Sequence, residues 1–223
     1  ITTETPIDTT TLDSAAAESV SILDLLLKGG WVMIPLIILF AVSIYIFVER
    51  IRVVKRAAVV PEQFMEKIRG LVSRGEISAA RILCSQTDSP ISRMIEKGVS
   101  RIGSPLKSIE AAIENVGKLE LYRLEKNLTL LATISGAAPM IGFLGTVTGM
   151  IQAFIAIAQE EGNVSPQLLS TGIYEAMITT ATGLAVGILA YLGYNYLVSR
   201  VNKVVHQMEY ISIDFIDLLQ EPT

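Results

Sequence analysis

One acidic side chain, Glu175, interrupts an apolar stretch that is long enough to cross a membrane. The stretch covers residues 168–198, and Glu175 is its only charged side chain. A membrane span needs about 20 apolar residues, and an ionisable group inside the bilayer costs about 2.5 kcal/mol or more, so it usually faces a protein interior or a water-filled path. Four hydroxyls that can donate and accept in such a path lie nearby: Thr171, Thr179, Thr180 and Thr182. The residues therefore predict a helix that helps to line a proton-conducting route.

Small residues punctuate a second apolar stretch, residues 128–158. Three glycines recur at spacings of three and four, so they share one helix face and let a second helix approach closely: Gly142, Gly145 and Gly149. Pro139 frees a backbone carbonyl, which a membrane helix tolerates where neighbours or water satisfy it. Thr146 and Thr148 lie among the glycines. For Thr148 two interpretations stay open, a hydroxyl on the proton route or one that bonds back to its own helix.

Length and composition indicate that these stretches belong to a helical membrane protein. Of 223 residues, 51% are hydrophobic and 18% are charged, and the mean hydropathy is +0.51, which is too apolar for an ordinary soluble domain. A further apolar stretch, residues 31–48, precedes the other two. Fifteen of the eighteen lysines and arginines fall in residues 49–127, and positive residues near spans stay on the cytoplasmic side. We predict an all-α protein with three spans, its N-terminus outside and its C-terminus inside.

The predicted organisation follows from this topology. The sequence begins at Ile1 rather than at methionine, so an upstream segment is expected, either a cleaved signal peptide or further residues. In chain order the predicted segments are an external tail with a short interfacial helix (1–30), the first span (31–48), a cytoplasmic helical loop (49–127), the second span (128–158), an external turn (159–167), the third span (168–198) and a cytoplasmic C-terminal helix (199–223).

Helical periodicity continues on the cytoplasmic side. The last helix of the loop starts near Pro105 and runs toward the second span without an evident break, which predicts one long helix. An apolar seam follows the third span and predicts packing on the loop helices or on neighbouring copies: Val201, Val204, Met208, Ile211, Phe215 and Leu218. His206 lies beside this seam and is interpreted as a surface residue.

Several classes of function find no support in the residues. There is no cluster of metal ligands, no nucleophile with a nearby histidine and no phosphate-binding loop, so neither an enzyme nor a cofactor is predicted. The basic surplus of the loop is interpreted as a topology signal that meets anionic membrane lipid. Nucleic-acid binding has no aromatic interleaving to support it. The single cysteine, Cys84, excludes a disulfide within the chain and is interpreted as a buried structural thiol.

Two motifs resemble the signatures of the MotA/TolQ/ExbB proton channel family. The first is Ala138-Pro139 followed by residues 142–150, GFLGTVTGM. The second is residues 172–184, GIYEAMITTATGL, followed by Tyr194-Asn195. Their order and the three-span layout with a large first internal loop are similar to the ExbB and TolQ branch over essentially the whole chain. The flagellar MotA branch has an additional span.

The resemblance implies roles for individual residues and for partners. The family's third-span glutamate corresponds to Glu175, and its pathway threonines correspond to Thr146 and Thr180; Thr148 and Thr179 are further candidates. Copies in that family form a ring, typically a pentamer, around the transmembrane helices of a single-span ExbD-like or TolR-like partner. Protons pass by way of an aspartate on the partner, and the work is passed to TonB or TolA. The implied location is the bacterial inner membrane.

Helical geometry separates the two best candidates. Thr180 lies about 140° round the helix from Glu175, so both cannot point into one lumen. We expect Thr180 in the lumen and Glu175 nearer the contact between neighbouring second and third spans. A direct role in proton movement and a structural role as a neutral acid both stay open for Glu175.

Two classes of function are compatible with the residues. The first is a channel-forming stator of a proton-driven motor, ExbB-like and coupled to TonB-dependent outer-membrane transport, with a TolQ-type or gliding-type motor as the alternative branch. The second is a non-conducting membrane scaffold whose glycine and threonine faces serve only helix packing.

Overall fold

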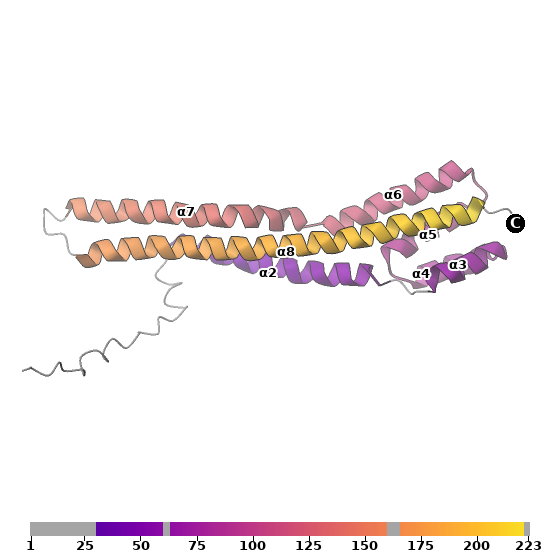
Figure 1. Ribbon diagram of the computed structural model, residues 1–223, viewed down its shortest axis with the longest axis horizontal. Helices are drawn as coiled ribbons and strands as arrows, with labels where there is room; N and C mark the ends of the chain where they lie inside the picture. The colour runs from indigo at the N-terminus through magenta and orange to yellow at the C-terminus, as the bar shows by residue number, and fades with distance from the viewer. Residues whose placement is uncertain (1–29, 60–62, 160–165, 221–223) are drawn as a thin grey trace, which may run out of the picture. The chain divides into compact units, whose positions relative to one another are not determined.

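The computed structural model describes residues 30–59, 63–159 and 166–220, and within these ranges all regular secondary structure is helical (Figure 1). Three helical stretches are long and apolar enough to cross a membrane: Met33–Ala57, Leu106–Gln159 and Ser170–Gln220. The prediction of an all-α chain with three apolar, membrane-length helices is therefore confirmed for these residues. The predicted interfacial helix and external tail, and most of the external turn, lie outside the described residues.

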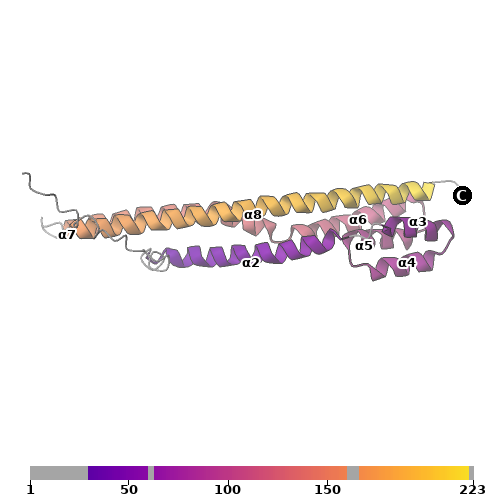
Figure 2. The same ribbon diagram turned by 60° about the horizontal axis from the view of Figure 1, so that its bottom comes forward.

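The chain forms two compact units, and the first consists of Ile1–Leu36 and Ile141–Gly183. Its described part holds the C-terminal half of α7 (Leu128–Gln159) and the first third of α8 (Pro166–Gln220). These two segments run antiparallel and side by side (Figures 1 and 2), and Gly172 at one end approaches Ala153 while Gly183 at the other approaches Gly142. This unit contains the glycines and threonines of the candidate pathway.

The second unit consists of Ile37–Met140 and Leu184–Thr223. It contains most of α2 (Met33–Ala57), and four further helices: α3 (Phe64–Ser73), α4 (Ile77–Gln86), α5 (Pro90–Val99) and α6 (Leu106–Glu125). Successive helices from α3 to α6 pack on one another. Helix α5 begins at a defined cap, because Ser89 accepts a hydrogen bond of 3.1 Å from the Ser92 N–H, and Pro90 occupies the first helical turn.

The apolar seam of α8 packs on the loop helices of the same chain. Phe215 is fully buried, and a Cβ atom on Gly98 of α5 would lie only 2.6 Å from the Phe215 ring, so the ring rests directly on the α5 backbone. Asp214, the neighbouring residue, forms an ion pair of 2.8 Å with Arg69 of α3. The sequence left two packing partners open for this seam, the loop helices or neighbouring copies. The structure shows the seam packed on the loop helices.

The prediction of one unbroken helix from the loop into the second span is wrong. Helix α6 ends at Glu125 and α7 begins at Leu128. Between them Lys126 is extended, with ψ of 135°, and Asn127 has φ of 65°. Asparagine is one of the few residues that adopt this left-handed conformation readily, and it commonly ends helices.

Side chains from α2 stabilise this break. Arg50 donates from Nη1 to the carbonyl oxygen of Arg123 at 3.1 Å, which satisfies one of the carbonyls that the end of α6 leaves without a helical partner. The amide of Asn127 lies 3.4 Å from Oε2 of Glu49. The break therefore depends on residues about 75 positions away, which helical periodicity in α6 and α7 does not report.

The left-handed conformation at Asn127 predicts a contrast between two substitutions. Asn127→Gly should leave the free energy of unfolding within about 0.5 kcal/mol of Asn127, whereas Asn127→Val should lower it by about 1–2 kcal/mol because a Cβ-branched side chain clashes at positive φ. Both variants lose the contact with Glu49, so the difference between them reports backbone conformation alone. Thermal unfolding of the purified protein in detergent measures this difference, and equal stability of the two variants would contradict the broken helix.

Two predictions about single polar residues are confirmed. Cys84 is buried, and burial raises the pKa of its thiol to about 12, with the neighbouring Glu96 carboxylate adding to the effect. Because the thiolate is the reactive form, burial and the raised pKa both fit a structural thiol. His206 is exposed on α8, with its Nδ1 3.4 Å from Oε2 of Glu209.

Large apolar side chains cover much of the outer surface of α2 and α7. Exposed apolar side chains in such number on one helix are typical of membrane-facing or subunit-facing surface. Prominent exposed members are Ile34, Ile37, Ile38, Ile44, Met140, Phe143, Leu144, Ile151 and Phe154.

Candidate functional site

The glycines of α7 bring its backbone against α8. A Cβ atom on Gly142 would lie 2.8 Å from the backbone oxygen of Thr179 and 3.1 Å from Cα of Gly183. A Cβ atom on Gly145 would lie 2.6 Å from Cβ of Thr179, and one on Gly149 would lie 3.2 Å from Cβ of Ala176. Only glycine fits the tightest of these positions without movement of α8. We refer to this contact between Gly142–Gly149 and Ala176–Gly183 as the glycine seam.

A pair of threonines lies within the glycine seam. Thr180 of α8 donates from Oγ1 to the carbonyl oxygen of Gly142 at 3.0 Å, and its Oγ1 lies 3.5 Å from Oγ1 of Thr146. Thr146 donates its own hydroxyl proton to the carbonyl of Phe143, one turn earlier in α7. The close approach at Gly142 is what brings the Thr180 hydroxyl within reach of α7.

The hydroxyl pair has alternative hydrogen-bond arrangements. Each threonine hydroxyl carries one proton and two acceptor sites and can rotate about its C–O bond. If the Thr146 hydroxyl turns away from Phe143, its proton can point toward Oγ1 of Thr180 across the 3.5 Å gap. The pair can therefore redirect a hydrogen bond between α7 and α8 without movement of either helix backbone. Neither hydroxyl titrates near neutral pH, so the pair needs a separate acid that supplies or accepts the proton.

The other two threonine candidates bond within their own helices. Thr148 donates to the carbonyls of Leu144 at 3.0 Å and Gly145 at 3.1 Å. Thr179 is buried and donates to the carbonyl of Ala176 at 2.9 Å. Of the two interpretations of Thr148, the structure shows the hydroxyl that bonds back to its own helix.

The structure does not bring Glu175 into the threonine pair. Its carboxylate lies against Gly30, just before α2, where the backbone has φ of 64°. A side chain at position 30 would overlap the Glu175 carboxylate, and an L-residue would also be strained at this φ. Five residues separate Glu175 from Thr180, which amounts to a rise of about 7.5 Å along α8. The side chain of Glu175 is half-buried.

Pro139 lies against α8 in the second unit, one helical turn before the glycine seam. A Cβ atom on Gly187 would lie 2.6 Å from Cγ of Pro139 and 3.0 Å from the backbone oxygen of Ser135. A proline at 139 has no N–H for the carbonyl four residues earlier, which is that of Ser135. The missing side chain at Gly187 lets the α8 backbone cover this carbonyl.

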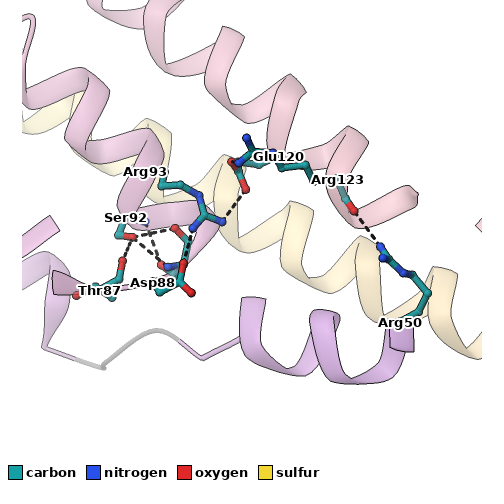
Figure 3. Close-up of polar contacts among 8 residues, drawn as sticks. Arg50, Thr87, Asp88, Ser92, Arg93, Glu120 and Arg123 are labelled. Carbon is teal, nitrogen blue, oxygen red and sulfur yellow. Dashed lines mark hydrogen bonds and ion pairs between the residues drawn. The ribbon is translucent and has the colours of Figure 1, made fainter. Parts of the chain in front are cut away.

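A buried acid that no sequence signal marks lies in the helices between the first and second apolar stretches. Glu120 of α6 is only 4% exposed and forms ion pairs of 2.7 Å with Arg93 and with Arg123 (Figure 3). Arg93 also pairs with Asp88 at 2.6 Å. The hydrogen bond that Arg93 donates to the Glu120 carboxylate, together with the charge of that carboxylate, raises the pKa of Arg93 further above its usual range. Arg93 and Arg123, which were counted among the basic residues of a topology signal, thus form ion pairs with an acid of the same chain.

Removing the charge of Glu120 is expected to destabilise the packing of α5 and α6. Glu120→Gln should lower the free energy of unfolding by about 1–3 kcal/mol, because two charged hydrogen bonds at a buried site are weakened. The matched control is Glu76→Gln, which weakens an exposed pair with Arg74 of 3.4 Å and should change stability by less than about 0.5 kcal/mol. Urea unfolding followed by circular dichroism compares the two, and equal effects would contradict a structural role for Glu120.

Comparison with known protein families shows which family the chain belongs to. Residues 86–210 match the MotA/TolQ/ExbB proton channel family, a segment that includes all of α7 and most of α8. The chain belongs to this family. The resemblance carried by the two span motifs is confirmed, and Thr146, Glu175 and Thr180 lie inside the matched segment.

Relatives of the MotA/TolQ/ExbB family extend the similarity to most of the chain. An ExbB homologue from Methanothermobacter thermautotrophicus is 30% identical over 196 residues, 86% of this chain and 68% of the relative. An ExbB-like protein from Synechocystis is 31% identical over 193 residues, 86% of this chain and 75% of the relative. The Tol-Pal system protein TolQ from Haemophilus influenzae is 30% identical over 198 residues, 82% of this chain and 86% of the relative. ExbB-type and TolQ-type relatives are thus equally similar to the chain.

Membership of a proton channel family agrees with what the site offers chemically. The glycine seam holds threonine hydroxyls and backbone carbonyls, which are groups that donate and accept hydrogen bonds. In the part of the chain that the structure describes, no group of three histidine, cysteine or acidic side chains could hold a metal ion.

Proposed function

We propose that the chain is the channel-forming stator subunit of an inner-membrane motor driven by the proton motive force, and that it is ExbB-like. The observation that carries the proposal is the threonine pair, Thr146 and Thr180, held across the glycine seam of a proton channel family member. An ionisable carboxyl group at membrane depth is costly, so it usually faces a protein interior or a polar path. Glu175 supplies the carboxyl group on the same helix.

The proposed arrangement in the membrane follows the distribution of charge. Fifteen of the eighteen lysines and arginines lie between the first two spans, and Arg200 and Lys203 directly follow the third, so the loop helices and the C-terminal part of α8 are proposed to be cytoplasmic. The N-terminus is then periplasmic. Copies of the chain form a ring, proposed to be a pentamer, whose lumen is lined by α7 and α8.

A partner with its own titrating group is required by the energetics. Moving one charge through 100 mV releases about 2.3 kcal/mol, and this energy becomes work only if a moving element is protonated and deprotonated. The apolar part of this chain offers one acid, Glu175, and no base. We propose a single-span ExbD-like partner inside the ring that carries the acid, and a TonB-like protein that transmits the work to outer-membrane transport.

A TolQ-type role is the second candidate. The observation in its favour is the match to TolQ of Haemophilus influenzae, of which the chain covers 86%. The two candidates share the channel and differ in the transmitting protein. Co-purification with the natural complex separates them, because a TonB-like partner supports the first role and a TolA-like partner supports the second.

Glu175 gives the prediction that separates a conducting channel from a scaffold. Glu175→Gln keeps the size and hydrogen-bonding shape of the side chain but cannot release a proton, so proton-dependent uptake should fall about tenfold while the complex still assembles. Uptake of an outer-membrane substrate in intact cells, with and without a protonophore, measures this. Thr146→Ala and Thr180→Ala are tested beside it. Full-rate uptake in all three variants would contradict the channel and favour the scaffold.

The control for these variants is a polar residue outside the membrane segment. His206→Gln removes the only histidine, which is exposed on the cytoplasmic extension of α8, and uptake should stay within about twofold of the unsubstituted protein. Assembly of each variant is verified by its co-purification with the partner. A loss of uptake together with a loss of assembly would report folding rather than proton transfer.

A further inference from the structure

An apolar groove lies between α2 and α8 in the second unit. It has a volume of about 430 Å³ and is lined almost entirely by carbon atoms, including those of Phe40 and Phe47 on α2, Leu131 on α7 and Leu192 on α8. Gly193 forms part of its floor, where a Cβ atom would lie 3.1 Å from the Phe47 ring. The groove lies within helices that are apolar enough to cross a membrane.

A second groove continues from the first along the same two helices. Tyr196 lines both, and its ring lies 6.3 Å from that of Phe47. The second groove, of about 320 Å³, is lined by Lys55 of α2 and by Arg200 and Lys203 of α8. The surface therefore changes from apolar to positively charged along one continuous path.

The basic side chains at this end are available to a ligand. Among the residues that the structure describes, Lys55, Arg200 and Lys203 form no ion pair with an acidic side chain. Arg200 donates from Nε to the Tyr196 hydroxyl at 3.2 Å, and its guanidinium carbon lies 5.1 Å from the centre of the Tyr196 ring. This contact orients the guanidinium and leaves its terminal N–H groups for a phosphate.

The distance along α8 from the apolar groove to the basic groove is close to the thickness of one leaflet of the hydrocarbon core. Leu192 and Lys203 are eleven residues apart on α8, a rise of about 16 Å. Half of the hydrocarbon core of a bilayer is about 15 Å. A lipid with its acyl chain against Leu192 therefore places its phosphate near Arg200 and Lys203.

We propose that the groove between α2 and α8 is a binding site for one anionic phospholipid of the leaflet at the basic end. The acyl chain fills the apolar part, and the phosphate and charged headgroup bind Lys55, Arg200 and Lys203. Charge complementarity favours this occupant over a second copy of the chain. A second copy of the chain would bring the same positive charges to the basic end of the groove, because Arg52, Lys55 and Arg56 follow the apolar part of α2. Those charges would repel Arg200 and Lys203.

Lipid retention tests the proposal on the full-length protein. The protein is reconstituted in phosphatidylcholine vesicles that contain one part in ten of phosphatidylglycerol, extracted in detergent and analysed by native mass spectrometry. Phosphatidylglycerol should be retained in preference to phosphatidylcholine. The double variant Arg200→Gln/Lys203→Gln should retain at least about tenfold less, as expected for the loss of two charges beside a lipid phosphate. Soluble glycerol 3-phosphate should not displace the lipid, since the apolar groove contributes to binding.

The matched control removes two charges from another face of α2. Arg52 and Arg56 line a neighbouring surface with Tyr45, which meets the apolar groove at Ile44, and neither arginine lines the groove between α2 and α8. Arg52→Gln/Arg56→Gln should leave phosphatidylglycerol retention within about twofold of the unsubstituted protein. Equal loss in both double variants, no preference for phosphatidylglycerol, or displacement by glycerol 3-phosphate would each overturn the proposal.

Photo-crosslinking identifies the occupant without relying on the charge variants. Leu192 is 59% exposed and lines the apolar groove, so a benzophenone amino acid at this position can react with whatever fills it. The expected product is a phospholipid adduct on the α8 peptide. An adduct with a second copy of the chain, or with another protein, would show that a helix occupies the groove and would overturn the lipid site.

Discussion

Replacing Thr180 with valine is expected to reduce proton flux through the complex by about a hundredfold. Valine keeps the shape of threonine and removes the hydroxyl that donates to Gly142 at 3.0 Å and lies 3.5 Å from Thr146. The cost in stability should be about 1 kcal/mol, the usual net value of one hydrogen bond. The complex should therefore still assemble, and the loss should appear in flux. Proton-dependent uptake in cells, normalised to the amount of assembled complex, measures it.

Thr180→Ser is the matched control for this prediction. Serine retains the hydroxyl and loses only a methyl group, so flux should stay within about threefold of the unsubstituted protein. If Thr180→Val and Thr180→Ser reduce flux equally, the packing of the side chain rather than its hydroxyl is required. That result would contradict a role for the threonine pair in proton transfer.

Adding a methyl group at Gly142 is expected to have the second largest effect. A Cβ atom there meets three backbone atoms of α8, at 2.8, 3.1 and 3.2 Å, and backbone cannot move aside as a flexible side chain can. Gly142→Ala should lower stability by about 1–3 kcal/mol through overpacking, despite the better helix propensity of alanine. Proton flux should fall as well, because separation of α7 and α8 moves Thr180 away from Gly142 and Thr146. Thermal unfolding of the purified protein in detergent measures the stability change.

Gly136 provides the control on the same helix. No atom lies within 4 Å of a Cβ atom built at this position. Gly136→Ala should therefore be neutral or stabilise the protein by up to about 1 kcal/mol. If Gly136→Ala and Gly142→Ala change stability alike, the glycines act through helix propensity and the glycine seam has no special role.

Much of the fold follows from the sequence because its signals are local. Each of the three apolar stretches of membrane length reports one helix, and the apolar seam that includes Phe215 reports one buried face. The spacing of Gly142, Gly145 and Gly149 likewise predicted a close helix contact, and the structure places these glycines against α8.

The features that the sequence analysis missed depend on residues far apart in the chain. The break at Asn127 is supported by Glu49 and Arg50 of α2, and Glu120 is buried because Arg93 of α5 lies beside it. A local signal for the break did exist, since asparagine favours the left-handed conformation that ends helices. No comparable signal marks Glu120, which has the sequence context of an exposed helical acid.

In the candidate site, too, local features could be predicted and features that depend on packing could not. Helical geometry predicted that Glu175 and Thr180 point in different directions, and the structure places the first against Gly30 and the second against Gly142. The expected place of Glu175, at the contact between neighbouring second and third spans, stays a prediction. Helical geometry could not tell which threonine bonds across to α7, because that depends on how closely the two backbones approach. The lumen that Thr180 is expected to face belongs to a ring of copies and stays a prediction.

The most direct test of the proposed proton pathway is proton flux through the purified complex in lipid vesicles. The chain is co-purified with its single-span partner and reconstituted, a pH gradient and a membrane potential are imposed, and a trapped dye reports the internal pH. The complex and its Thr180→Ser variant should acidify the vesicles faster than protein-free vesicles, and the Thr180→Val variant should not. Equal flux in the complex and in Thr180→Val, or no flux above that of protein-free vesicles in any of them, would contradict the pathway between α7 and α8.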